Sequence, residues 1–297
     1  MKLNIVKHRN VWYSVSAFLI LVSVIVLFAW KLQPGIDFTG GSLLEVSIAS
    51  HPTHTEVQDV VVKAGYAEAI VQISDKNVLV RTQPLSEEQH QSVLAALKTA
   101  FGDTTEMRFD SIGPVIGNEL RRTALFGIGA SLILIGFYIS WAFRGAGDFI
   151  SSKKIALLTV VKTFHDVLIS IGFFAILAHF YGYEMDTAFV AAALTILGYS
   201  INDGVVVLDR TRENLKNKIS THLSVVVDKA IEQTLARSIN TSVTVFLALL
   251  SVYLFGGDTT RPFALLLLIG VAVGTYSSVF IASPALVTLE NWGKGKK

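Results

Sequence analysis

Six apolar segments long enough to cross a lipid bilayer constrain this chain more than any other feature. They occupy residues 11–30, 123–143, 155–180, 187–208, 239–255 and 262–289. The hydrocarbon core of a bilayer is about 30 Å thick, so a helix needs about 20 apolar residues to span it. Hydrophobic residues make up 52% of the chain and charged residues only 16%, which is typical of integral membrane proteins. We therefore predict a mainly α-helical membrane protein with a six-helix transmembrane bundle.

Lysine and arginine gather on alternate connections between these segments. The basic residues of that set are Lys2, Lys7, Arg9, Arg144, Lys153, Lys154, Arg210, Arg212, Lys216, Lys218, Lys229, Lys294, Lys296 and Lys297. The opposite connections carry no basic residue in 181–186 and only Arg261 in 256–261. Because basic loops are retained on the cytoplasmic side, both termini are predicted to be cytoplasmic. No small-residue cleavage site follows the first segment, so we expect it to stay as an anchor.

Residues 31–118 are too polar to span a membrane and too long for a loop inside a compact bundle. The predicted elements are a strand within 38–50, a helix after the capping box of Thr53 and Glu56, a hairpin turning at 75–77, a helix after the capping box of Ser86 and Gln89, and a strand within 107–112. This order is that of a ferredoxin-like α+β domain, here placed outside the membrane between the first two helices.

The chain thus divides into four parts. They are residues 1–30 with the cytoplasmic N-terminus and first helix, the external domain 31–118, the helices of 119–290 with a cytoplasmic loop at 209–237, and the basic cytoplasmic tail 291–297. Ionisable residues inside a spanning segment are costly in lipid, so they are candidates for function.

The third apolar segment contains Lys162, His165 and Asp166. Lys162 and Asp166 are one helical turn apart, close enough to pair. Two interpretations are open for this group. Either it takes part in ion movement, or it is a local contact in which two charges neutralise each other.

The fourth segment contains Asn202 and Asp203, and Arg237 opens the fifth at a comparable depth. If Asp209 and Arg210 mark the membrane surface, Asp203 lies about 9 Å inside it. An ion pair between Asp203 and Arg237 would join two antiparallel helices. Burial favours the protonated carboxyl and a nearby guanidinium favours the ionised one, so the pair is either an ion-operated switch or a fixed buttress.

Small polar residues continue along the fifth helix. Thr234, Ser238, Thr241 and Ser242 form a stripe near the helical period, which is able to line a water path or to bond backbone and neighbouring helices. Gly270 and Gly274 have the GxxxG spacing of closely packed helices and precede Ser277 and Ser278.

Several function classes find no support in the sequence. There is no cysteine, so neither a disulfide nor a thiolate metal site is available, and a net charge of +2 does not favour nucleic acid as a partner. His51 and His54 flank a proline without a third ligand, which favours a surface turn over a metal site. No nucleophile set, phosphate loop or nucleotide motif occurs, so we expect neither enzyme chemistry nor a cofactor.

Taken together, the motifs resemble the SecF family. They are Asp37-Phe-Thr-Gly-Gly41, His165-Asp166, Gly198-Tyr-Ser-Ile-Asn-Asp203, Asp209-Arg-Thr-Arg-Glu-Asn214, Arg237-Ser238 and Gly270-Val-Ala-Val-Gly-Thr-Tyr-Ser-Ser278, in the family's order over nearly the whole chain. The resemblance implies a bacterial inner-membrane protein of the resistance-nodulation-division superfamily, paired pseudo-symmetrically with SecD. It also implies association with the SecYEG channel, often with YajC, and use of the proton or sodium gradient in late export of preproteins.

The same resemblance implies that Asp203 and Arg237 take part in proton passage and that Asp166 is a motif residue, whereas Lys162 lies outside the motif. Other functions stay open at this point. A superfamily exporter of lipids or small molecules predicts a substrate cavity and no SecD partner. A structural scaffold predicts that neutral residues replace Asp203 and Arg237 without loss. An intramembrane aspartyl protease is disfavoured, because the glycine expected directly before the acid is missing from Gly198-Tyr-Ser-Ile-Asn-Asp203.

Overall fold

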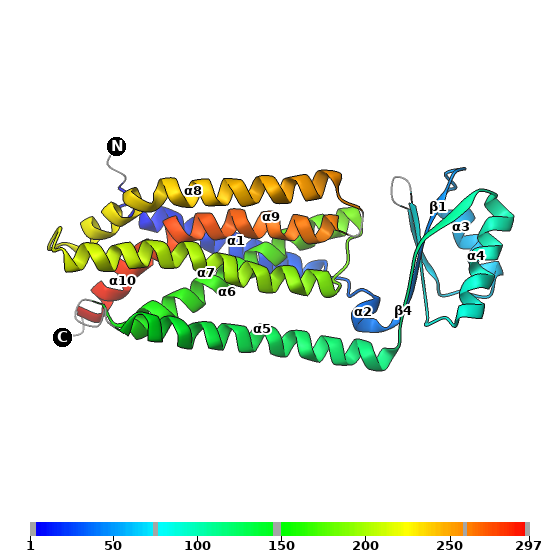
Figure 1. The fold of residues 1–297 in the computed structure, drawn as a ribbon, viewed down its shortest axis with the longest axis horizontal. Coiled ribbons are helices and arrows are strands. Elements are labelled where there is room, and N and C mark those ends of the chain that lie inside the picture. Colours follow the sequence, from blue (N-terminus) through cyan, green and yellow to red (C-terminus); the bar gives the residue numbers. More distant parts are fainter. Residues whose placement is uncertain (1–3, 74–76, 145–149, 258–259, 295–297) are drawn as a thin grey trace. The chain divides into compact units, whose positions relative to one another are not determined.

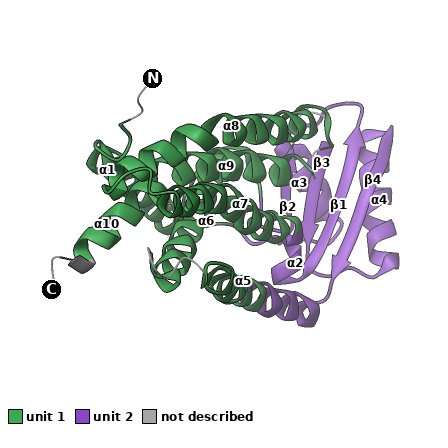
Figure 2. Ribbon diagram, turned by 60° about the vertical axis from the view of Figure 1, so that its left-hand side comes forward, with its two compact units in different colours: residues 1–32, 126–183, 188–297 green, residues 33–125, 184–187 purple. Residues whose placement is uncertain are grey.

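The computed structural model describes residues 4–73, 77–144, 150–257 and 260–294 of the chain. The predicted turn residues Asp75 and Lys76, and the basic residues Lys2, Lys296 and Lys297, lie outside the described residues. The chain forms two compact units, one of residues 1–32, 126–183 and 188–297, the other of residues 33–125 and 184–187 (Figure 2). The helices α5 (Pro114–Ala142) and α7 (Thr187–Lys216) begin in the second unit and continue in the first.

Within the described residues, six helices are long and apolar enough to cross a membrane, as predicted. Besides α5 and α7 they are α1 (Arg9–Ala29), α6 (Ser152–Tyr181), α8 (Leu223–Phe255) and α9 (Arg261–Ser277), which continues through the π-helical η2 (Ser278–Ala282) into α10 (Ser283–Lys294) (Figure 1). The π-helical turn ends two residues before Pro284, which has no N–H for the regular helical ladder. Instead, Ser283 Oγ donates to the Ser278 carbonyl at 2.8 Å.

The fourth and fifth helices are longer than their apolar segments. Residues 209–237, expected as a loop, are helical except for 217–222. Their charged residues pair one turn apart, as Arg210 with Glu213 and Lys229 with Glu232. Such pairs stabilise an exposed helix, which explains why the helices extend past the apolar stretch.

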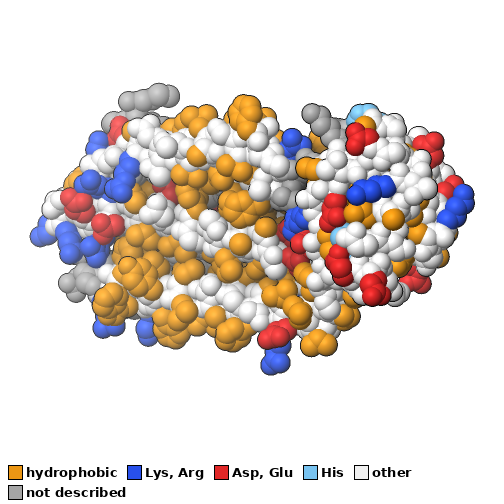
Figure 3. Space-filling view, turned by 45° about the vertical axis from the view of Figure 1, so that its right-hand side comes forward, with side chains coloured by type: hydrophobic (Ala, Val, Ile, Leu, Met, Phe, Trp, Pro, Cys, Tyr) orange, Lys and Arg blue, Asp and Glu red, His pale blue; other side chains and the backbone are white. Residues whose placement is uncertain are grey.

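The helices differ in how much of their surface is covered. The apolar windows of α6 and of the α9–α10 span are 56% and 61% buried, whereas those of α1, α5 and α8 are 11%, 6% and 11% buried. Hydrophobic side chains accordingly cover the flanks of the helices (Figure 3). Polar residues on the covered faces of α6, α7 and α9 therefore lie inside the bundle, where they must find protein partners.

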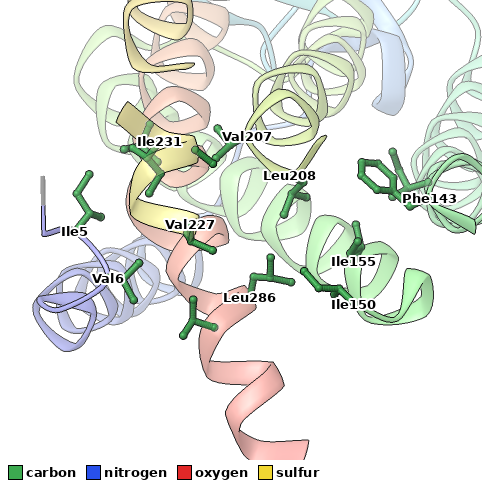
Figure 4. Packing of buried hydrophobic residues seen from close by; sticks show 14 of the residues in the cluster. Ile5, Val6, Phe143, Ile150, Ile155, Val207, Leu208, Val227, Ile231 and Leu286 are labelled. Carbon is green, nitrogen blue, oxygen red and sulfur yellow. The ribbon is translucent and has the colours of Figure 1, made fainter. Parts of the chain in front are cut away.

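A cluster of apolar side chains closes the bundle at the end that holds both termini. Ile5 and Val6 of the N-terminal segment pack there with Val227 and Ile231 of α8 and with Leu286 of α10 (Figure 4). The backbone N–H of Val6 also donates to Asp228 Oδ1 at 3.0 Å. The N-terminal segment is thus part of the bundle core.

The second unit confirms the predicted ferredoxin-like fold. Its elements are α2 (Ile36–Thr39), β1 (Gly41–Ile48), α3 (His54–Lys63), β2 (Ile70–Ile73), β3 (Asn77–Thr82), α4 (Glu87–Phe101) and β4 (Thr104–Ile112). The strands form one antiparallel sheet in the order β2-β3-β1-β4, with α3 and α4 on one face (Figure 1). Both predicted capping boxes are present.

Alternating side chains of β1 build the core of this unit. Leu44, Val46 and Ile48 pack against Val57 of α3 and Leu97 of α4. A β-bulge shifts the pairing with β4 between residues 45 and 46, but its extra residue, Met107, is on β4, so the alternation of β1 continues across it. The short helix α2 was not predicted, since its four residues are too few for a periodic signal.

Candidate functional site

The charged residues of α6 lie in the interior of the bundle. Lys162 is 2% exposed and Asp166 is fully buried, and Lys162 Nζ lies 3.0 Å from Asp166 Oδ2. Their spacing of four residues puts both side chains on one face of the helix. The predicted contact between the two residues is therefore present.

Hydroxyl groups from other helices complete the shell of Asp166. Ser200 Oγ of α7 and Ser277 Oγ of α9 donate to Oδ2 at 2.6 and 2.7 Å. His165 Nδ1 lies 2.8 Å from Oδ1, and His165 Nε2 lies 2.9 Å from Ser16 Oγ of α1. Because a carboxylate only accepts, Nδ1 carries the proton and Nε2 accepts from Ser16 when the ring is neutral. Both oxygens of Asp166 are thus occupied.

Lys162 is equally well surrounded. It donates to the carbonyl oxygen of Ser200, to Ser200 Oγ at 2.9 Å, and to the carbonyl oxygen of Gly274 at 3.4 Å. The group therefore ties α1, α6, α7 and α9 together. Such saturation is what a buried ion pair needs to offset the loss of hydration.

Asp203 lies on α7, three residues beyond Ser200, and is 8% exposed. Its Oδ1 accepts a hydrogen bond from Ser238 Oγ of α8. Its Oδ2 is buried and has no hydrogen-bond partner within the described part of the chain. The two buried acids thus differ, because Asp166 is saturated and Asp203 is not.

The expected ion pair between Asp203 and Arg237 is not formed, which corrects the sequence prediction. Arg237 is exposed and lines a cavity of about 340 Å³ with Phe143, which follows α5, and with Val205 and Asp209 of α7. Successive residues on a helix point about 100° apart, so when Ser238 points at Asp203 its neighbour Arg237 points away from that carboxylate. The inward positions of α8 recur every four residues, at Thr234, Ser238 and Ser242.

The polar stripe on α8 has mixed partners. Thr234 Oγ1 donates to the carbonyl of Ala230 at 2.9 Å, a local bond within the helix. Ser242 Oγ lies 2.6 Å from Thr275 Oγ1 of α9 and accepts from Tyr199 OH of α7 at 2.8 Å. Thr241 of α8 and Asn202 of α7, both singled out from the sequence, are exposed and lie outside these contacts.

Ser16, Ser200 and Ser277 were not identified as site residues from the sequence. Ser200 lies inside the motif that ends at Asp203, and Ser277 follows the GxxxG glycines Gly270 and Gly274. Their place in these motifs is the sequence feature that indicates a role in the site. Gly270 lets α9 approach α7 closely, since a Cβ there would overlap the side chain of Ile196, whereas one on Gly274 would make an ordinary contact with Ser200. Within the described residues, no three His, Cys, Asp or Glu side chains gather as a metal site would require.

Comparison with known proteins identifies the family. Residues 92–292 match a family profile described as "Protein export membrane protein SecD/SecF, C-terminal", and residues 25–49 match the "SecD/SecF GG Motif". The "Protein translocase subunit SecF" of Anaerolinea thermophila is 38% identical over 302 residues, which cover 98% of this chain and 97% of that one. This chain belongs to the SecF family.

A second SecF, from Thermobaculum terrenum, is 37% identical over 303 residues, covering 97% of this chain and 94% of that one. The crystal structure of SecDF from Thermus, described as a translocon-associated membrane protein, matches with a TM-score of 0.85 and 31% identity. That match covers 98% of this chain and 39% of the SecDF chain, so this SecF corresponds to less than half of the solved protein. The chain is a membrane protein of the protein-export families.

Proposed function

We propose that this chain is the SecF subunit of a SecD–SecF pair that couples an ion gradient, of protons or of sodium, to late stages of preprotein export. The observation that carries the proposal is the buried Oδ2 of Asp203, which has no partner within the described residues. A buried carboxylate without full compensation gains from taking up a proton or a cation. Asp203 is therefore the group in this bundle best suited to change its ion occupancy.

Asp166 and Lys162 take a different role in this proposal. Protonating Asp166 would weaken the ion pair and three further hydrogen bonds at once. We assign these two residues, with His165, to a fixed link between the helices that surrounds the ion-coupling group. Ser200 joins the fixed link to α7, three residues from Asp203.

Arg237 is assigned to the path by which ions reach Asp203. The cavity that it lines is also bordered by Asp209, Glu213 and Thr234, so it is polar enough to hold water. Ser238, the neighbour of Arg237, bonds Asp203 directly. A change of charge at Asp203 is thereby linked to the position of α8. One proton crossing 100 mV releases about 2.3 kcal/mol, enough to bias a two-state equilibrium roughly fifty-fold.

The family and the distribution of charge support the proposed partners and location. The Thermus relative is a SecDF protein described as translocon-associated, which supports SecD and the SecYEG channel as partners of this chain, and the family resemblance adds YajC to the proposal. The alternation of basic and non-basic connections supports an inner-membrane protein with both termini in the cytoplasm and the α/β unit on the opposite side. The translocating preprotein is then the substrate, and no catalytic chemistry is required.

The test is the variant Asp203→Asn in cells that depend on this chain for export. Asn keeps the shape of the Asp side chain and an acceptor oxygen for Ser238, but it carries no charge and takes up no proton near neutral pH. Pulse-chase export of a secreted preprotein should lose its gradient-dependent part, measured as the fraction that an ionophore removes. Asp59→Asn, an exposed acid of the α/β unit, is the matched control and should behave as wild type. Full ionophore-sensitive export in Asp203→Asn would refute the proposal.

A further inference from the structure

The motif Asp37-Phe-Thr-Gly-Gly41 lies where several elements of the second unit converge. Gly40 and Gly41 have φ values of +74° and +131°, which favour glycine. A Cβ on Gly40 would lie 2.9 Å from Pro114 Cα at the start of α5, and one on Gly41 would lie 2.7 Å from the Thr82 carbonyl oxygen of β3. The two glycines are thus explained by backbone packing, and Asp37 is the charged member of the motif.

The Asp37 carboxylate caps α7. Its Oδ2 accepts from the backbone N–H of Thr187, the first residue of that helix, and from Thr187 Oγ1, both at 2.7 Å. The first N–H groups of a helix have no partner within the helix, and negative charge is favoured at this end. A cap normally comes from the residue just before the helix, but here it comes from 150 residues away.

Backbone bonds hold the same connection to the α/β unit. The N–H of Met185 donates to the Gln33 carbonyl at 2.9 Å, and the N–H of Gly35 donates to the Met185 carbonyl at 2.7 Å. Pro34 and Met185 form a parallel bridge between these bonds. Residues 184–187 accordingly group with the α/β unit and not with the helices that they connect.

An ion pair adds a second fastening. Arg81 of β3 contacts Glu184, and their side chains are only 17% and 15% exposed. Burial lowers the pKa of Arg81 to about 10, so the guanidinium stays charged near neutral pH. Both residues line a cavity of about 260 Å³ that Glu68 also borders, whereas Arg81 Nε is buried and has no hydrogen-bond partner within the described residues.

We infer that Asp37 is the positioning residue that fastens the start of α7 to the α/β unit, with Arg81 and Glu184 as the second point of the clasp. The clasp transmits axial movement of α7 to that unit. This inference rests on the proposed function for the identity of the moving residue, Asp203. Asp203 lies sixteen residues beyond Thr187 on one unbroken helix, a distance of about 24 Å at 1.5 Å per residue.

The fastening is tested by hydrogen exchange on the full chain purified with whatever partner accompanies it. Asp37→Ala should speed exchange at the first-turn amides of α7 by about fivefold, the effect of losing one cap. Asp37→Asn keeps an acceptor oxygen and should fall between wild type and Asp37→Ala. Asp59→Ala, an exposed acid of the same unit, should leave these amides unchanged. Unchanged first-turn exchange in Asp37→Ala would overturn the fastening.

Transmission is tested by combining variants at the two ends. Asp203→Asn imitates the protonated acid and should change exchange in β3, 77–82, when Asp37 is present. In the Asp37→Ala background the same substitution should change exchange around residue 203 but no longer in β3. A purely structural role of Asp37 predicts that Asp203→Asn acts equally on β3 in both backgrounds, and this result would overturn the transmission.

The export assay separates this inference from the proposed function. If Asp203→Asn keeps full ionophore-sensitive export while the exchange results hold, the proposed function fails and the clasp stands. If Asp203→Asn loses that export but β3 responds without Asp37, the proposed function stands and the clasp fails. Asp37→Ala should itself lose the ionophore-sensitive fraction of export with unchanged amounts of protein in the membrane.

Discussion

Two buried aspartates in one bundle have opposite surroundings, and this difference assigns their roles. Asp166 accepts from Lys162, His165 and two serines, so its charge is fully compensated. Asp203 accepts from one serine and keeps one buried oxygen without a partner among the described residues. A saturated pair favours a single state, and an unsaturated acid changes state at a lower cost.

The first residue-scale prediction concerns the pair on α6. Lys162→Met leaves the charge of Asp166 buried without its main partner and should destabilise the protein by about 3–5 kcal/mol. The double variant Lys162→Met with Asp166→Asn removes both charges and should recover most of that loss. Thermal unfolding of the purified protein measures both. Equal destabilisation in the single and double variants would show that the charges are not coupled.

At the scale of elements, capping and close packing set the geometry. Thr53 N–H and Oγ1 donate to Glu56 Oε2 at 2.7 and 2.8 Å, so α3 begins at a defined residue. Between membrane helices, small residues set how closely two helices approach each other. A Cβ on Gly172 of α6 would overlap Ser23 of α1, which shows how closely the two helices approach.

The capping box makes α3 sensitive to acid. Hydrogen bonds from Thr53 lower the pKa of Glu56 below its ordinary value. A carboxyl with a lowered folded pKa stabilises the fold above its unfolded pKa of about 4.3, and this contribution is lost as the pH falls through the folded value. Exchange at the first-turn amides of α3 should therefore be constant above about pH 5, after correction for intrinsic rates, and increase below it. Glu56→Gln should abolish this dependence, and an unchanged profile in that variant would contradict the assignment.

The packing of α1 on α6 gives a prediction with a built-in control. Gly172→Ala forces the backbone near Ser23 to move and should destabilise the protein by about 1–3 kcal/mol. Gly127→Ala on α5 meets no atom within 4 Å and should be neutral or stabilising by up to about 1 kcal/mol. Thermal unfolding distinguishes them, and equal effects of the two substitutions would mean that α1 and α6 are not closely packed.

Which parts of this arrangement are visible in the sequence depends on whether their cause is local. The spans, the order of the α/β unit and the two capping boxes follow from hydropathy and short motifs. The rotation of α8, which turns Ser238 inward in place of Arg237, depends on packing, although the four-residue spacing of Thr234, Ser238 and Ser242 indicates it. The contact of Asp37 with Thr187 has no local signal, because 150 residues separate them.

On the scale of the whole molecule, the bundle has an enclosed interior and uncovered outer helices. The spans of α6, α7 and α9 hold most of the buried polar groups, while α1, α5 and α8 are mostly uncovered and apolar. Such faces suit lipid and partner helices. This chain matches 39% of the SecDF chain from Thermus. The rest of that chain supports a SecD partner that covers part of this apolar surface.

Ion flux through the assembled pair tests the central proposal most directly. The chain is purified with its SecD partner, reconstituted into vesicles, and exposed to an imposed proton or sodium gradient while an ion-sensitive dye reports flux. We predict flux above that of empty vesicles for the wild type and for Asp59→Asn, and flux equal to empty vesicles for Asp203→Asn. Equal flux in Asp203→Asn and wild type would contradict the assignment of Asp203 as the ion-coupling residue.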